Sequence, residues 1–144
     1  MKFITTVNLQ PFERTYSLAF IDFLCKVLPD FDINEIDVLY GLAWGNDVFK
    51  WETRTIGLGS LKTEIEHVEN QGFGKIGDDD LIISISSHNL EITLCHETDL
   101  HIKFEAPTPL FEKILNTFLQ YFQLSHKRNS LLNLLFSFQI NLLS

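Results

Sequence analysis

The side chains best suited to chemistry gather in the segment Cys-His-Glu-Thr-Asp-Leu-His, which runs from Cys95 to His101. Thiolate, imidazole and carboxylate groups are all zinc ligands, and strand alternation places Cys95 and His101 on one face. The segment has neither C-x2-C nor H-E-x-x-H spacing, however, and a single tight turn cannot easily aim four groups at one point. The pattern therefore favours a polar hairpin turn, with a partner-recognition loop and a metal site as alternatives. We expect no metal and no cofactor.

A nucleophilic enzyme would need a base within hydrogen-bond reach of a serine or cysteine. Cys95 and His96 are neighbours in sequence, but successive residues of a strand point to opposite faces. No G-x-S-x-G motif or P-loop occurs, and the glycine-rich segment 72–77 runs directly into three aspartates that would repel a phosphate. We therefore expect a protein that is not an enzyme, and a small enzyme built on residues 95–101 is the alternative.

Acidic residues set the electrostatic character of the chain. The net charge is −8, from 19 acidic and 11 basic residues. Residues 61–112 hold 11 acidic and 3 basic residues, and they include the run Asp78-Asp79-Asp80. This balance argues against a nucleic-acid binder, which needs a basic stripe for phosphates. It favours either a solvated face that keeps the chain soluble or a negative patch that steers a basic protein partner.

The candidate partner-binding residues combine acidic side chains near turns with one histidine and two aromatic anchors. They are Asp78, Asp79, Asp80, Glu97, Asp99, His96, Trp51 and Phe73. Clustered carboxylates mainly raise the association rate with a basic partner, whereas aromatic anchors at the centre of an interface slow dissociation. Packing in the core is the other interpretation of Trp51.

The chain length and composition fit one domain. A chain of 144 residues with 45% apolar and 21% charged residues has ordinary globular usage, so we expect a single domain over residues 1–144. Cys25 and Cys95 share no metal or redox spacing, so we expect no disulfide. The sequence has no signal-peptide pattern and no apolar run of transmembrane length, which predicts a cytoplasmic protein without a membrane span.

The clearest structural signal is a set of three alternating runs between residues 81 and 105. Their apolar positions are Leu81, Ile83, Ile85, Leu90, Ile92, Leu94, Leu100, Ile102 and Phe104. One apolar and one polar face are typical of an antiparallel meander. A register with a three-residue loop at 96–98 would place Glu91 opposite Lys103, which is a favourable cross-strand pair.

The remaining pattern indicates an α+β fold in which helices flank this antiparallel sheet. Residues 61–69 fit a helix or an edge strand, and we favour the helix. The apolar tail 131–144 is too short to span a bilayer and is expected to form a helix that packs on the core or at an interface. The other expected elements are a strand over 3–9, a helix from Pro11 to before Pro29, a second helix over 32–43, a strand over 48–56 and a helix from Leu110.

Two segments carry a resemblance to a known class of protein. With Gly-Lys-Ile-Gly-Asp-Asp-Asp-Leu at 74–81 and Leu-Cys-His-Glu-Thr-Asp-Leu-His at 94–101, the chain looks like small immunity-protein-type domains of bacterial toxin–immunity systems. Size, acidity and a polar-faced antiparallel sheet extend the resemblance over residues 1–125. It implies a protein that binds one toxin domain, often a basic nuclease, and blocks it by covering the active site. No binding residue is carried over by motif match.

Two further functions stay open beside this resemblance. An acidic type III secretion chaperone has similar size and charge, although such chaperones typically begin with a helix and dimerise, whereas this chain is expected to begin with a strand. A small enzyme built on 95–101 is the other. Whether the protein forms a homodimer is left open by the sequence.

Overall fold

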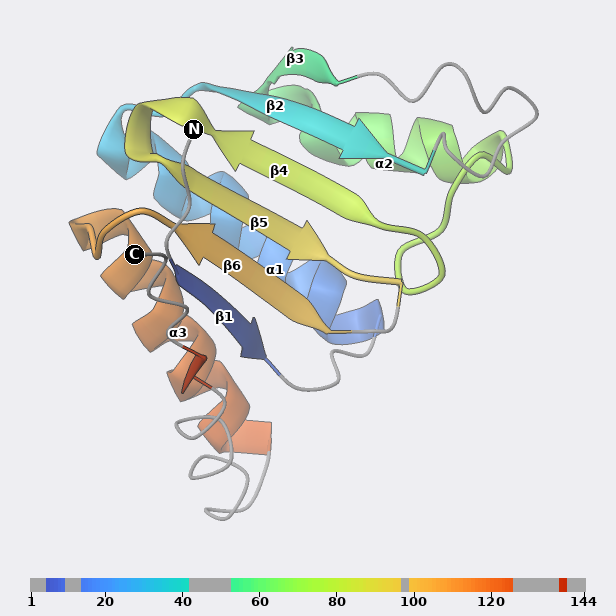
Figure 1. Ribbon diagram of the computed structural model, residues 1–144. Coiled ribbons are helices and arrows are strands. Elements are labelled where there is room, and N and C mark those ends of the chain that lie inside the picture. The colour runs from blue at the N-terminus through green and yellow to red at the C-terminus, as the bar shows by residue number, and fades with distance from the viewer. Residues whose placement is uncertain (1–4, 10–13, 42–52, 97–98, 126–137, 140–144) are drawn as a thin grey trace.

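The computed structural model describes residues 5–9, 14–41, 53–96, 99–125 and 138–139. Over these residues the chain forms one sheet of strand order β3-β2-β4-β5-β6-β1-β7, in which every pairing is antiparallel. Three helices accompany the sheet (Figure 1), and the expected α+β class is confirmed. The elements are β1 (Thr5–Leu9), α1 (Arg14–Val27), β2 (Glu35–Tyr40), β3 (Arg54–Gly57), α2 (Leu61–Asn70), β4 (Leu81–Ile85), β5 (Leu90–Leu94), β6 (Leu100–Phe104), α3 (Pro109–Ser125) and β7 (Phe138–Gln139).

The expected meander is formed by β4, β5 and β6, as the central part of this larger sheet. All nine apolar positions assigned to its inner face are buried. Glu91 pairs with Lys103, as the expected register requires, and Lys103 Nζ lies 3.2 Å from Glu91 Oε1. The Cys95 amide donates to the Asp99 carbonyl oxygen at 2.8 Å, which leaves three residues in the loop between them.

The helices cover the apolar face of the sheet. Figure 1 shows α1 and α2 behind the strands, and buried residues of all three helices belong to one core cluster with the inner face of the meander. At the start of α3, the ring of Phe111 stacks on that of Phe104 with 3.9 Å between centroids. The polar face of the meander is therefore turned away from the helices, and its side chains are partly exposed.

The expectation of a helix over 32–43 is wrong, because residues 35–40 form β2 between β3 and β4. Ile36, Val38 and Tyr40 are buried, while Asp37 and Leu39 between them are partly exposed. That alternation has the period of a strand. Positions 36 and 40 satisfy helical spacing as well, and the two β-branched residues Ile36 and Val38 fit a pleated surface better than a helix.

The other elements match their expectations where the structure describes them. Of the strand expected over 3–9, the described part, Thr5–Leu9, is confirmed, as are the helices α1 and α3. Residues 61–69 are helical, with Leu61, Ile65 and Val68 buried. Of the strand expected over 48–56, only the part beginning at Arg54 is described. No helix among the described residues is long and apolar enough to cross a membrane.

The C-terminal tail, residues 131–144, is described only at residues 138–139, and there it is not the expected helix. Phe138–Gln139 forms β7, which pairs antiparallel with Thr6 and Val7 of β1, so a helix is wrong for these two residues. The backbone groups of β1 that face away from β6 need hydrogen-bond partners, and a short strand supplies them. The rest of 131–144 lies outside the described residues.

Candidate functional site

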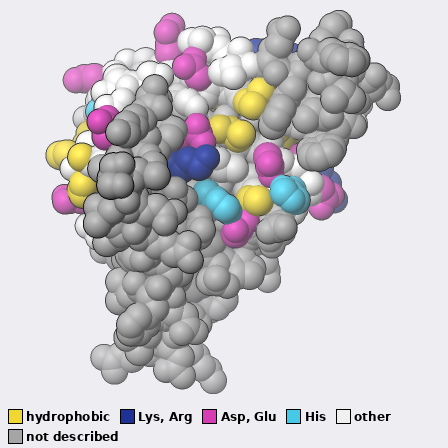
Figure 2. All heavy atoms as spheres, in the orientation of Figure 1, with side chains coloured by type: hydrophobic (Ala, Val, Ile, Leu, Met, Phe, Trp, Pro, Cys, Tyr) yellow, Lys and Arg dark blue, Asp and Glu magenta, His cyan; other side chains and the backbone are white. Residues whose placement is uncertain are grey.

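The register of the meander brings three chemically capable residues into one row. Leu94 pairs with Leu81 on one side and with Leu100 on the other. The neighbouring residue, Cys95, therefore lies between Asp80 and Asp99. Each of the three is one step from a buried leucine, so the row belongs to the polar face. In the same orientation as Figure 1, Figure 2 shows acidic, histidine and basic side chains gathered on this face.

A histidine accompanies each aspartate of the row. His96 contacts Asp80 twice: its backbone N–H donates to Asp80 Oδ1 at 2.7 Å, and its ring Nδ1 lies 2.8 Å from the same oxygen. His101 Nε2 lies 2.6 Å from Asp99 Oδ2. Two aspartate–histidine pairs therefore flank the Cys95 thiol on opposite sides.

Each aspartate–histidine pair forms, together with Cys95, a group with the composition and compactness of a metal-binding cluster. Ligand atoms of Asp80, Cys95 and His96 lie within 4.8 Å of one another, and so do those of Cys95, Asp99 and His101. Both groups share the sulfur atom. Asp80 lies outside the 95–101 segment of the sequence and reaches this cluster through the β4–β5 pairing. Glu97 lies outside the described residues.

The arrangement around Cys95 differs from a catalytic relay. Cys95 Sγ lies 3.6 Å from His96 Nδ1, so the expectation that these neighbours point to opposite faces is wrong. The reason is that β5 ends at Leu94 and His96 stands in the turn. In a nucleophile–histidine–acid relay, the two ring nitrogens serve different partners. Here Nδ1 faces both the thiol and the Asp80 carboxylate.

The three consecutive aspartates have unequal environments. Asp79 Oδ2 accepts from the Lys75 amide at 2.8 Å, and the amides of Asp78 and Asp79 donate to the Lys75 carbonyl oxygen at 3.0 and 2.9 Å. Asp80 is engaged by His96. The Asp78 side chain is exposed and makes no hydrogen bond or ion pair to a described residue. Asp78 is therefore the carboxylate of the run that is most available to a partner.

Of the two aromatic anchors, only one is described. Phe73 is partly buried and packs against the core cluster, so the structure gives it a packing role. Trp51 lies outside the described residues.

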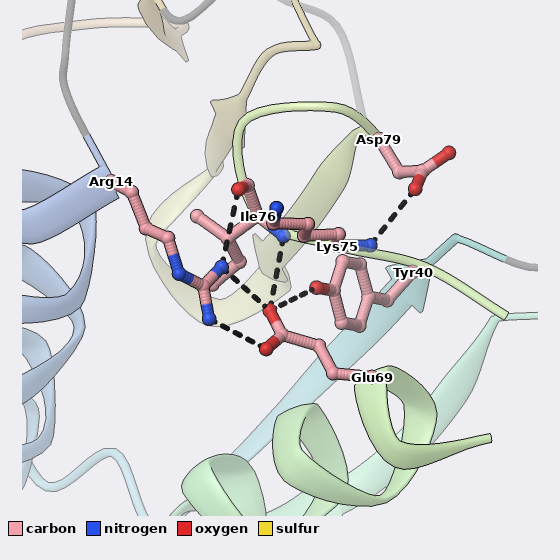
Figure 3. A network of polar contacts seen from close by, with 6 residues as sticks. All are labelled: Arg14, Tyr40, Glu69, Lys75, Ile76 and Asp79. Carbon is pink, nitrogen blue, oxygen red and sulfur yellow. Dashed lines mark hydrogen bonds and ion pairs between the residues drawn. The ribbon is translucent and has the colours of Figure 1, made fainter. Parts of the chain in front are cut away.

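A polar network that the sequence did not indicate holds residues 75–80, the acidic loop, in place (Figure 3). Glu69 accepts from the two terminal guanidinium nitrogens of Arg14, Nη1 and Nη2, at 2.9 and 2.6 Å. It also accepts from the Tyr40 hydroxyl and the Ile76 amide, each at 3.1 Å. Arg14 donates in addition to the Ile76 carbonyl oxygen at 3.2 Å. One carboxylate thus joins α1, β2, α2 and the loop that leads to Asp78.

These contacts shift the ionisation of both acidic groups in the network. The hydrogen bonds from Arg14 hold the pKa of Glu69 below its ordinary value, and the Ile76 amide adds to this against the opposing effect of burial. Burial, reinforced by the neighbouring Glu69 charge, raises the pKa of the Tyr40 hydroxyl well above its ordinary value. Glu69 is therefore ionised and Tyr40 neutral at neutral pH, which suits the donor and acceptor roles that they have here.

The glycine-rich segment 72–77 serves close packing. Its spacing is G-x-G-x-x-G, but it follows helix α2 and precedes strand β4, the reverse of the strand–loop–helix order that binds nucleotides. Gly74 lies directly against Gly41 at the end of β2, where a Cβ built on Gly41 would be 2.7 Å from Gly74 Cα. The glycines therefore let the acidic loop approach the sheet.

Comparisons with known proteins add no family to this description. No family model, curated protein or solved structure matches the chain.

Proposed function

We propose that this protein is a binding protein of the immunity type, which takes a basic bacterial toxin domain on its acidic loop region and neutralises it by covering the active site. The supporting observation is the placement of carboxylates at one end of the meander. The Asp80–His96 contacts join the 78–80 loop to the β5–β6 turn, so acidic residues from two loops share one end of the sheet.

The fixed geometry of the loop suits recognition. Asp79 closes a turn onto Lys75, and Glu69 anchors the chain at Ile76. A loop that is ordered before binding loses less conformational entropy when a partner docks. A preorganised acidic loop therefore favours a tight complex, as an inhibitor requires.

The roles of the acidic residues in this proposal are unequal. Asp78 presents its charge directly, because its side chain is exposed. Asp79, Asp80 and Asp99 have partners inside the protein, so they contribute long-range charge and hold the surface in shape. A tight complex of this kind would bury about 1,200–2,000 Å² in total.

Association kinetics with a purified basic toxin domain of nuclease type test the proposal. Asp78→Asn should slow association at low salt and flatten its salt dependence, because steering by charge acts on encounter. Glu112→Gln is the matched control. It removes the same charge beside Phe111, which packs at the opposite end of β6 from Asp99. An unchanged association rate in Asp78→Asn would contradict the steering role.

Capture experiments in the source cell test whether the protein binds and neutralises a toxin at all. The wild-type chain should retain a basic protein, and that protein should lose its toxic activity in the complex. Failure to recover any protein partner would contradict the immunity proposal as a whole.

A further inference from the structure

We propose that the β5–β6 hairpin carries a binding site for a zinc-class divalent transition metal, with the Cys95 thiolate, the Asp99 carboxylate and the His101 imidazole as ligands and a water molecule in the fourth position. This site does not rest on the binding function proposed above, although the two share Asp99, and it concerns the isolated protein.

The hairpin backbone fixes the relative positions of the three ligands. Cys95 and Asp99 face each other across the strand pair, and the Cys95 amide donates to the Asp99 carbonyl oxygen at 2.8 Å. His101 follows two residues later, so it shares their face of the sheet. Side chains that are opposite or diagonal on one face are close enough to meet at a common point. The sequence contains no zinc motif because the pairing, and not the spacing along the chain, brings these ligands together.

The side-chain distances suit an ion after a small adjustment. The three ligand atoms lie within 4.8 Å of one another. Metal–ligand distances of about 2.0–2.3 Å in a tetrahedron correspond to ligand atoms roughly 3.3–3.8 Å apart. The 2.6 Å contact between His101 Nε2 and Asp99 Oδ2 would open, and the longer distances would shorten.

A second observation concerns the Asp99 carboxylate at the same place. Asp99 Oδ2 contacts His101, but Asp99 Oδ1 is buried and has no hydrogen-bond partner among the described residues. Carboxylate oxygens that are shielded from water are normally paired, because an unpaired one keeps the full cost of its desolvation. A cation held between Asp99 and Cys95 would give this oxygen a partner.

The donor set selects the class of metal. Calcium and magnesium prefer sites built from oxygen ligands only, whereas thiolate and imidazole prefer zinc and its neighbours among the divalent transition metals. Asp80, on the other side of Cys95, adds negative charge next to the site. That charge offsets part of the cation's charge, while the cation itself stabilises the Cys95 thiolate.

The neighbouring group of Asp80, Cys95 and His96 fits the role of ligands less well. The side chain of His96 is 48% exposed, compared with 28% for His101 and 26% for Asp99. His96 is also fixed to Asp80 by both its backbone amide and its ring. We therefore assign His96 and Asp80 to a flanking pair outside the ligand set.

Titration of the reduced, purified chain with cobalt(II) tests the assignment, since cobalt replaces zinc and absorbs light when bound to a thiolate. We expect one cobalt per chain, a thiolate-to-cobalt charge-transfer band, displacement by zinc and no competition from magnesium or calcium. Cys95→Ser should abolish the band, while Cys25→Ser should keep it. Asp99→Asn and His101→Gln should weaken binding by at least about tenfold, and Asp80→Asn and His96→Gln by less than about threefold.

Three results would overturn the proposal. The first is the absence of a charge-transfer band in the wild-type chain, and the second is its persistence in Cys95→Ser. The third is loss of binding in Asp80→Asn and His96→Gln with retention in Asp99→Asn and His101→Gln. Because a variant can fail to fold, alkylation of the wild-type chain gives a separate readout. Zinc should slow the modification of Cys95 and leave that of Cys25 unchanged, and equal rates with and without zinc would also overturn it.

Discussion

Glu91 and Lys103 form an ion pair across the β5–β6 ladder, with 3.2 Å between Lys103 Nζ and Glu91 Oε1. The two residues face each other only when the loop between the strands has three residues. A shift of one residue along either strand would move its apolar residues to the polar face. The pair therefore reports the register on which the whole polar row of Asp80, Cys95 and Asp99 depends.

The ion pair itself should contribute little free energy of unfolding. Its side chains are 41% and 20% exposed, so water screens the attraction. A double-mutant cycle with Glu91→Gln and Lys103→Met in urea melts should give a coupling energy of about 0.2–1 kcal/mol. A coupling well above this range would mean that the pair, and not the apolar face, fixes the register.

The apolar face should dominate the stability of the meander. Ile92 and Ile102 are fully buried and oppose each other, so replacing either with alanine leaves a cavity in the core. Each substitution should lower the free energy of unfolding by about 2–5 kcal/mol in denaturant melts. Thr93→Ala on the partly exposed polar face is the control and should cost less than about 1 kcal/mol. Neutral results for both isoleucines would contradict the assignment of faces.

Glu69 should make the stability of the fold depend on pH. Hydrogen bonds from Arg14 lower the pKa of Glu69 in the folded protein relative to the unfolded chain. Ionised Glu69 therefore stabilises the fold above the unfolded pKa of about 4.3, and this contribution is lost as the pH falls through the lower folded pKa. Glu69→Gln should cost about 1–3 kcal/mol at pH 7, and the difference from wild type should shrink at acidic pH.

Urea melts between pH 7 and pH 3 would measure this difference. Glu66→Gln removes the same charge from an exposed position of α2 and should stay within about 0.5 kcal/mol of wild type. A cost of Glu69→Gln that is the same at every pH would contradict the role of the Glu69 charge.

Gly41 should be intolerant of any side chain. Its φ angle is +62°, and a Cβ would lie 2.7 Å from the backbone of Gly74. Gly41→Ala should therefore destabilise the fold by clearly more than the ~1–2 kcal/mol that a left-handed conformation alone costs. Gly72 also has a positive φ angle, of 74°, but faces open space. Gly72→Ala is thus the control for backbone strain, and equal thermal shifts for the two variants would show that the contact with Gly74 is unimportant.

The sequence predicts the meander well because two independent constraints agree there. Alternation defines the faces of three strands, and the short turns leave few registers that keep the apolar sets together. The segment 35–40 lacks such agreement. Ile36 and Tyr40 fit both a helix and a strand, and only the pairing with β3 and β4 decides between them.

The candidate site was predicted in part for the same reason. Alternation assigns Cys95 and His101 to one face, whereas the β5–β6 pairing is needed to set Asp99 opposite Cys95. Asp80 joins them because the β4–β5 register places it opposite Cys95, and extending the pairing by one strand would have found it. The contact of Arg14 with Glu69 spans 55 positions and joins two helices. No local pattern predicts it, because it depends on how α1 and α2 pack.

The strand order also has a consequence for how the chain reaches its fold. β1 pairs with β6, with Leu9 opposite Leu100 and Thr5 opposite Phe104. β4, β5 and β6, by contrast, are joined by short turns. Closing a long loop costs more chain entropy than closing a short one, so the meander is expected to assemble before β1 docks. During synthesis, β1 leaves the ribosome well before β6, so it has no partner until residues 100–104 have been made.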